Sequence, residues 1–168
     1  MTNKLCERYS VKAYKDTPVP GEMLDKIIKA GTCAPTGRNL QSPIIIAVTD
    51  KTMRDKLSDM NKKILGSDSD PFYGAPVVLV VLAKKDVNTY LYDGSLVMGN
   101  LLNAAHFLGL GACWIHRAKE MFESEEGKDI LLSLGITEEY EGIGNCIIGY
   151  PDGTGKPKPK KENYVYYI

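Results

Sequence analysis

Short apolar runs that alternate with longer amphipathic stretches constrain the fold of this chain more than any other feature. The runs Ile44–Thr49 and Val77–Leu82 are unbroken and rich in β-branched residues, which predicts buried strands covered on both faces. We expect further strands at Ala112–Ile115 and Ile143–Tyr150, and a fifth at Tyr164–Ile168. Because helix-like stretches separate the strands, the order predicts the α+β class, with helices flanking one central sheet.

The expected helices begin and end at recognisable residues. One begins at Pro20 and ends near Gly31, and another is capped by Asp50. A short helix is expected from Lys128 to Leu134. The longest, from about Tyr90 to Leu108, is apolar over so wide an arc that it should be buried in the protein or in an interface. No Gly/Ser linker divides the chain, so we expect a single domain over residues 1–168.

Charge and cysteine usage exclude several classes of function. The 21 Lys and Arg residues balance the 21 Asp and Glu residues, which argues against a nucleic-acid-binding protein. The longest apolar run, Pro76–Ala83, is far too short to span a bilayer, and charged residues near Met1 leave no room for a signal peptide. Four isolated cysteines and two histidines predict no metal site and reduced thiols, as in a cytoplasmic protein.

Two segments carry candidate binding groups. In Arg8-Tyr-Ser-Val-Lys12, Arg8, Ser10 and Lys12 alternate, so an extended chain would point two cations and a hydroxyl the same way, as a phosphate site requires. The alternative is a solvated edge near the terminus. Ala34–Pro43 is rich in hydrogen-bonding side chains between two prolines, which suits either a rigid ligand-binding loop or an ordinary turn.

Two glycine-rich segments resemble nucleotide motifs without matching them. Gly109–Trp114 follows a helix and leads into a strand, the reverse of a dinucleotide-binding fingerprint, although its backbone could still donate N–H groups to a flat ligand. Gly153–Lys156 lacks the first glycine and the final hydroxyl residue of a phosphate-binding P-loop. The Lys-Pro stretch Lys156–Lys161 is extended and cationic, either a solvated tail or a phosphate contact.

Taken together and in this order, these segments resemble the nitroreductase family over nearly the whole chain. Arg8-Tyr-Ser-Val-Lys12 is similar to the family's R-x-S-x-[RK] motif, and Ala34–Gln41 to its A-P-S-x-x-N-x-Q loop. Tyr73-Gly-Ala-Pro76 before a strand, Asp93-Gly-Ser in the long helix and Ile148-Gly-Tyr-Pro151 complete the likeness. The resemblance implies a nitroreductase-like three-layer fold with a central mixed or antiparallel sheet, an intertwined homodimer, and FMN at the subunit interface.

The resemblance also implies roles for particular residues. Arg8, Tyr9, Ser10 and Lys12 would contact the flavin and its phosphate, and Lys160 and Lys161 would hold the phosphate from the C-terminal side. Pro35, Thr36 and Asn39 would reach FMN from the partner subunit, with Gln41 supporting their loop. The backbone of Gly111 and Ala112 would lie near flavin N5, and no side chain would be catalytic, because the cofactor carries the chemistry.

The implied activity is an FMN-dependent oxidoreductase that passes hydride from NADH or NADPH to a nitroaromatic, a quinone or a similar small acceptor in two half-reactions. Two alternatives are a dehalogenating or flavin-modifying enzyme of the same fold, and a flavin-binding protein without NAD(P)H turnover.

Overall fold

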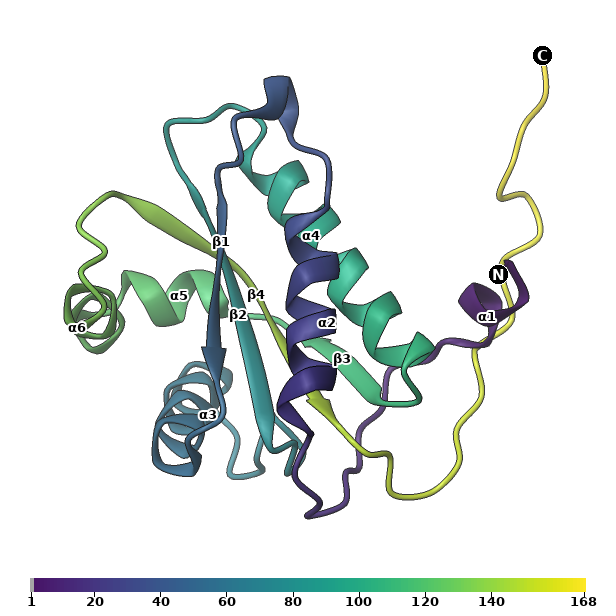
Figure 1. Ribbon diagram of the computed structural model, residues 1–168, viewed down its shortest axis with the longest axis horizontal. Coiled ribbons are helices and arrows are strands. Elements are labelled where there is room, and N and C mark those ends of the chain that lie inside the picture. The colour runs from purple at the N-terminus through teal and green to yellow at the C-terminus, as the bar shows by residue number, and fades with distance from the viewer. Residues whose placement is uncertain (1) are drawn as a thin grey trace.

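The computed structural model describes residues 2–168, in which a four-stranded antiparallel sheet lies between two layers of helices (Figure 1). The strands are β1 (Pro43–Val48), β2 (Val77–Lys84), β3 (Gly111–Ile115) and β4 (Tyr140–Gly149). Their order across the sheet is β1-β2-β4-β3, so β2 and β4 are central. The predicted α+β class and three-layer arrangement are confirmed.

Alternation along β2 explains the two layers. Odd-numbered residues such as Val77 and Leu79 face α2 (Gly21–Thr32) and α4 (Tyr90–Phe107). Even-numbered residues such as Val78 and Val80 face the opposite core. That second core is covered by α3 (Lys51–Leu65), α5 (Ala118–Glu123) and α6 (Glu125–Ser133). A strand that is covered on both faces is apolar at every position. This explains why β2 is an unbroken apolar run in the sequence.

Local capping fixes several helix ends. The Asp50 carboxylate accepts a hydrogen bond from the N–H of Met53 at 2.8 Å, as its position predicts. Ser124 caps α6 in the same way, so that helix begins three residues before the expected Lys128. Helices α1 (Thr2–Glu7) and α5 and the 3-10 turn η1 (Gly37–Asn39) were not expected, because they are too short to show helical periodicity.

Two strand predictions are wrong. β1 is an edge strand whose isoleucines are only half-buried, because its outer side has no neighbouring strand among the described residues. Tyr164–Ile168 forms no strand; it projects away from the sheet and is exposed (Figure 1). An apolar run forms a strand only where its backbone N–H and C=O groups can pair with the edge of another strand. This segment lies beside no such edge in the described structure.

The long helix α4 has two different sides. One packs against α2 and the sheet, where Gly31 of α2 leaves room for the Leu101 side chain. The other exposes Leu91, Tyr92 and Leu96 at 47%, 73% and 49%. An apolar helix face open to solvent marks an interface. No helix within residues 2–168 has both the length and the apolar character needed to cross a membrane.

Candidate functional site

The N-terminal segment lies beside β3 and presents its polar groups outward. Ser10 pairs with Ala112 in a parallel bridge, and the N–H of Val11 donates to the Ala112 carbonyl at 3.2 Å. Val11 is buried against Gly111, whereas Ser10 and Lys12 are exposed. Ser10 and Lys12 thus lie on the side of the segment opposite to Val11, as in an extended chain, and the orientation of Arg8 stays a prediction.

Cys113 on β3 is influenced by the N-terminal segment. Burial raises the pKa of the Cys113 thiol, and a hydrogen bond from Ser10 and the positive charges of Lys12 and Arg8 partly oppose that rise. The two cations are thus on the same part of the molecule as Ser10. A hydroxyl and two cations on one segment form a candidate site for an anion.

A pocket of about 210 Å³ adjoins these residues. Tyr73, which is 38% exposed, forms part of its wall, and the Lys12 ammonium lies 5.8 Å from the Tyr73 ring centroid. The pocket is lined by Lys12, Leu65, Ser69, Asp70, Pro71, Tyr73, Cys113, Trp114, Ile115, His116 and Arg117. Because Trp114 alternates with Cys113 and Ile115 along β3, its ring lies on the other face of the sheet, against Gly144. An aromatic side chain beside a few polar groups is typical of a ligand site.

Asp70 holds one wall of this pocket in place. Burial alone would raise the pKa of its carboxyl, but hydrogen bonds from Arg54, Ser58 and the N–H groups of Gly74 and Phe72 outweigh that effect and lower the pKa to about 2. Arg54 Nη2 lies 2.5 Å from the carboxylate. The negative charge of Asp70 is thus already balanced by Arg54 within the protein.

Arg117 enters the pocket from the turn after β3. Its backbone has a φ of 73°, in the left-handed region. Its Nε donates to Oδ1 of the fully buried Asn61 at 3.0 Å, and Asn61 Nδ2 donates to the His116 carbonyl at 2.8 Å. A side chain and a backbone held in this way occupy one geometry, which is common at functional sites.

The loop between α2 and β1 is strained and anchored. Arg38, Asn39 and Gln41 all have φ between 50° and 56°. The N–H of Gln41 donates to Thr36 Oγ1 at 3.0 Å, and the N–H of Gly37 donates to Asp93 Oδ1 at 3.0 Å. Three deviations of this kind within four residues persist only where surrounding bonds impose them.

The structure does not bring all the predicted site residues together. The loop that carries Pro35, Thr36, Asn39 and Gln41 lies at the opposite end of the molecule from the Arg8–Lys12 segment (Figure 1). Gly111 and Ala112 are buried in the sheet, next to Arg8–Lys12.

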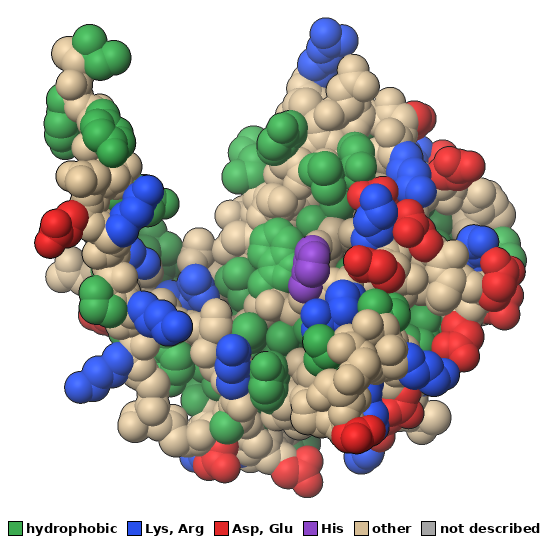
Figure 2. All heavy atoms as spheres, turned by 180° about the vertical axis from the view of Figure 1, so that it is seen from behind, with side chains coloured by type: hydrophobic (Ala, Val, Ile, Leu, Met, Phe, Trp, Pro, Cys, Tyr) green, Lys and Arg blue, Asp and Glu red, His purple; other side chains and the backbone are tan. Residues whose placement is uncertain are grey.

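The C-terminal segment carries Lys160 and Lys161, which are exposed. The N–H of Gly155 donates to the Tyr9 hydroxyl at 3.1 Å, so Tyr9 fixes the point where this segment leaves the body. Figure 2 shows the hollow between the segment and the body, with Lys and Arg side chains gathered at its base. Tyr9 thus connects the N-terminal segment, which carries Arg8 and Lys12, to the C-terminal segment, which carries Lys160 and Lys161.

Sequence reasoning missed Trp114, His116 and Arg117 as pocket residues. Each follows Gly111 and Ala112 by a few positions, but the left-handed backbone at Arg117 has no signal in the residue types there. Among residues 2–168, no group of three His, Cys, Asp or Glu side chains could hold a metal ion.

Comparison with known proteins gives a consistent result. Residues 5–150 match the model of the nitroreductase family. A protein of Methanothermobacter thermautotrophicus named NADH dehydrogenase/NAD(P)H nitroreductase is 31% identical over 116 residues, which cover 64% of this chain and 56% of that relative. An FMN-dependent nitroreductase from Clostridium difficile superposes with a TM-score of 0.83 at 30% identity, covering 99% of this chain and 98% of its own. A nitroreductase with bound FMN from Bacteroides fragilis gives a TM-score of 0.90 at 24% identity, covering 99% and 97%.

Proposed function

This chain belongs to the nitroreductase family, and on that premise we propose that it is an FMN-dependent oxidoreductase that uses NADH or NADPH. The observation that carries the proposal is the position of the Arg8–Lys12 segment along β3, which brings Lys12 to a pocket beside the Tyr73 ring. The relative named an NAD(P)H nitroreductase and the solved structure of an FMN-dependent nitroreductase support the same assignment.

The cationic groups fit the phosphate end of FMN. A phosphate monoester carries close to two negative charges near neutral pH, so it needs several cations and hydrogen-bond donors. Arg8 and Ser10 are near one another on the N-terminal segment, and Lys160 and Lys161 lie on the segment that Tyr9 tethers to it. We assign these residues to the phosphate.

The pocket fits the flavin ring. Tyr73 offers an aromatic wall for a planar ring system, and Lys12 lies next to Tyr73. A cation at the N1–O2 edge would stabilise negative charge on the reduced ring, and Lys12 is the candidate. This position also leaves Gly111 and Ala112 at the edge of the site, as the backbone neighbours expected near N5.

We propose that the active form is an intertwined homodimer. The exposed apolar face of α4 would pack against its twin, and the projecting Tyr164–Ile168 segment would add to the partner's sheet. The loop with Pro35, Thr36 and Asn39, supported by Gln41, would then approach the partner's FMN, which explains why it is remote from Arg8 within one chain. Each chain would form one domain.

Bound FMN would supply the redox chemistry, taking hydride from the nucleotide in one half-reaction and reducing a nitroaromatic, a quinone or a similar acceptor in the next. The protein's own residues would bind and orient the reactants. Because NADH and NADPH are cytoplasmic donors, we propose that the enzyme works in the cytoplasm.

A visible absorption spectrum of the purified protein tests the proposal. We expect flavin bands that bleach when NADH or NADPH is added without oxygen and return when an acceptor follows. Bands that persist would instead indicate a flavin-binding protein without NAD(P)H turnover, and no bands after incubation with FMN would contradict the proposal altogether.

The phosphate assignment has its own test. Arg8→Ala should weaken FMN retention by tenfold or more, because a charge-assisted hydrogen bond to a phosphate is lost. Lys26→Ala removes an exposed cation of α2 and serves as the matched control. Equal FMN affinity in the two variants would show that Arg8 does not bind the phosphate.

A further inference from the structure

The first two turns of α4 face in two directions. Tyr92 and Leu96 are 73% and 49% exposed, on the face that the proposed dimer would bury. Asp93, which follows Tyr92 directly, is 3% exposed and points inward to the loop between α2 and β1. The same short stretch of helix therefore carries the surface for a second subunit and the anchor of the strained loop.

The Asp93 carboxylate binds both ends of that loop. Its Oδ1 accepts a hydrogen bond from the N–H of Gly37 at 3.0 Å, and its Oδ2 accepts from the Ser42 hydroxyl at 3.4 Å. The Thr89 hydroxyl, one turn back, donates to Oδ2 at 2.9 Å and fixes the carboxylate itself. The left-handed residues lie between Gly37 and Ser42, so one side chain closes the segment that contains them.

Packing also fixes the loop to α4. A Cβ at Gly37 would overlap the Thr89 side chain, so the loop approaches the helix as closely as only glycine allows. Asn100 of α4 donates from its side-chain amide to the Ala30 carbonyl of α2 at 2.9 Å, shortly before the loop begins. The position of the loop is therefore set by the position of α4.

The anchored loop presents hydrogen-bond donors. Thr36 Oγ1 accepts from the N–H of Gln41 at 3.0 Å, and among the described residues its own O–H has no acceptor. The side-chain amide of Gln41 donates to Asn39 Oδ1 at 3.3 Å, which leaves the NH₂ group of Asn39 as the donor that the loop offers. The phosphate and the ring carbonyl oxygens of FMN are acceptors for such groups.

We propose that Asp93 is a positioning residue for FMN and that it acts across the subunit interface, because it holds the loop of one subunit in the shape that meets the FMN of the other. The inference deepens the proposed function and rests on it for the dimer and for the place of the loop. A loop that is already ordered binds a ligand more tightly than one that the ligand must order. Without the carboxylate, the left-handed residues would relax, and FMN would have to order them.

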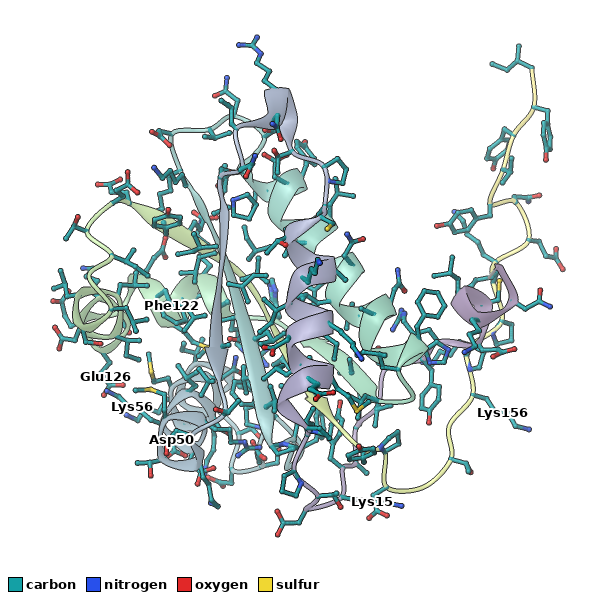
Figure 3. All side chains as sticks on the ribbon, in the orientation of Figure 1. Lys15, Asp50, Lys56, Phe122, Glu126 and Lys156 are labelled. Atoms are coloured by element: carbon teal, nitrogen blue, oxygen red, sulfur yellow. The ribbon has the colours of Figure 1, made fainter. Side chains whose placement is uncertain are left out.

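Titration of the flavin-free dimer with FMN, followed by flavin fluorescence, gives the first test. Asp93→Ala should raise the Kd for FMN at least tenfold, whereas Asp93→Asn, which can bind the same three partners, should stay within threefold. Gly37→Ala keeps the carboxylate but displaces the loop from Thr89, and it should also raise the Kd. Asp50→Ala removes a capping carboxylate at the end of β1 opposite the loop (Figure 3), so it controls for lost stability and should stay within twofold.

A mixed dimer tests whether Asp93 acts across the interface. One subunit carries Arg8→Ala and the other Asp93→Ala, each with its own affinity tag, and both homodimers, measured alongside, should have only weak sites. If Asp93 acts across the interface, both changes fall in one FMN site and the second site is intact, so half of the sites should bind with the parental Kd. If Asp93 acted within its own subunit, each site would carry one change and both would be weak.

Three outcomes would overturn the inference: a parental Kd in Asp93→Ala, equal Kd values in the alanine and asparagine variants, or two weak sites in the mixed dimer. If Asp93→Ala does not fold, Gly37→Ala replaces it in both experiments, with the same expected results. A parent protein that takes up no FMN would contradict the proposed function instead, whereas a parent that binds FMN regardless of Asp93 would refute the inference alone.

Discussion

Asp93 allows the most direct test of how the strained loop is held. Its carboxylate is only 3% exposed and accepts hydrogen bonds from the Gly37 N–H at 3.0 Å, Thr89 Oγ1 at 2.9 Å and Ser42 Oγ at 3.4 Å. The first two have good geometry. The third is long and contributes little.

The structure predicts different costs for two substitutions at Asp93. Asp93→Ala leaves the Gly37 N–H and two hydroxyls without their acceptor, and at about 1.5–3 kcal/mol for each good bond to a charged group we expect a loss of about 3 kcal/mol in the free energy of unfolding. Asp93→Asn can still accept from Gly37 while its NH₂ group donates to the Thr89 and Ser42 hydroxyls, which are also acceptors. The asparagine variant loses only the contribution of the negative charge to these hydrogen bonds, about 1 kcal/mol in the free energy of unfolding.

Urea unfolding at saturating FMN measures the difference. With a slope near 2 kcal/mol/M, Asp93→Ala should lower the midpoint by about 1.5 M and Asp93→Asn by about 0.5 M. The control is Asp25→Ala, on the exposed side of α2. If the alanine and asparagine variants unfolded at the same midpoint, or if both matched the parent, Asp93 would not hold the loop by these hydrogen bonds.

Three further predictions concern stability. The lowered pKa of Asp70 means that its contribution is fully present above its usual pKa of 3.8 and is lost as the pH falls toward about 2, so the stability difference between parent and Asp70→Asn should shrink over that range in urea titrations. Gly142→Ala should cost about 1–3 kcal/mol, because its Cβ would meet the Ala118 backbone carbonyl, whereas Gly21→Ala meets nothing nearby and should change thermal unfolding little. Asp50→Ala should lower stability by about 1 kcal/mol through loss of the α3 cap, and circular dichroism melting curves would reveal a neutral effect if the cap were unimportant.

The strands and helix ends were predictable from the sequence where residue type and local spacing determine them. The buried runs at β2 and β4 and the Asp50 cap depend on residue type and spacing, and the structure confirms them. The edge position of β1 was not predictable, because the apolar composition of this edge strand is that of an internal strand.

The candidate site was only partly predictable for a related reason. The exposure of Ser10 and Lys12 on either side of the buried Val11 requires nothing beyond an extended chain, so the sequence was sufficient for that arrangement. The contribution of Arg117 depends on a left-handed backbone and on Asn61, which is distant in sequence, and neither leaves a local pattern. Tertiary packing, not propensity, places that side chain.

The C-terminal segment has a consequence for the entropy of assembly. In the described structure its last hydrogen bond to the body is the one from Gly155 to Tyr9, so the residues that carry the two terminal lysines are not positioned in advance. Ordering each residue costs about 1–2 kcal/mol of backbone entropy. In the proposed dimer, FMN binding and subunit pairing would order the same segment, so whichever occurs first lowers the entropic cost of the other. Cofactor affinity and dimer affinity should therefore be thermodynamically coupled and rise together.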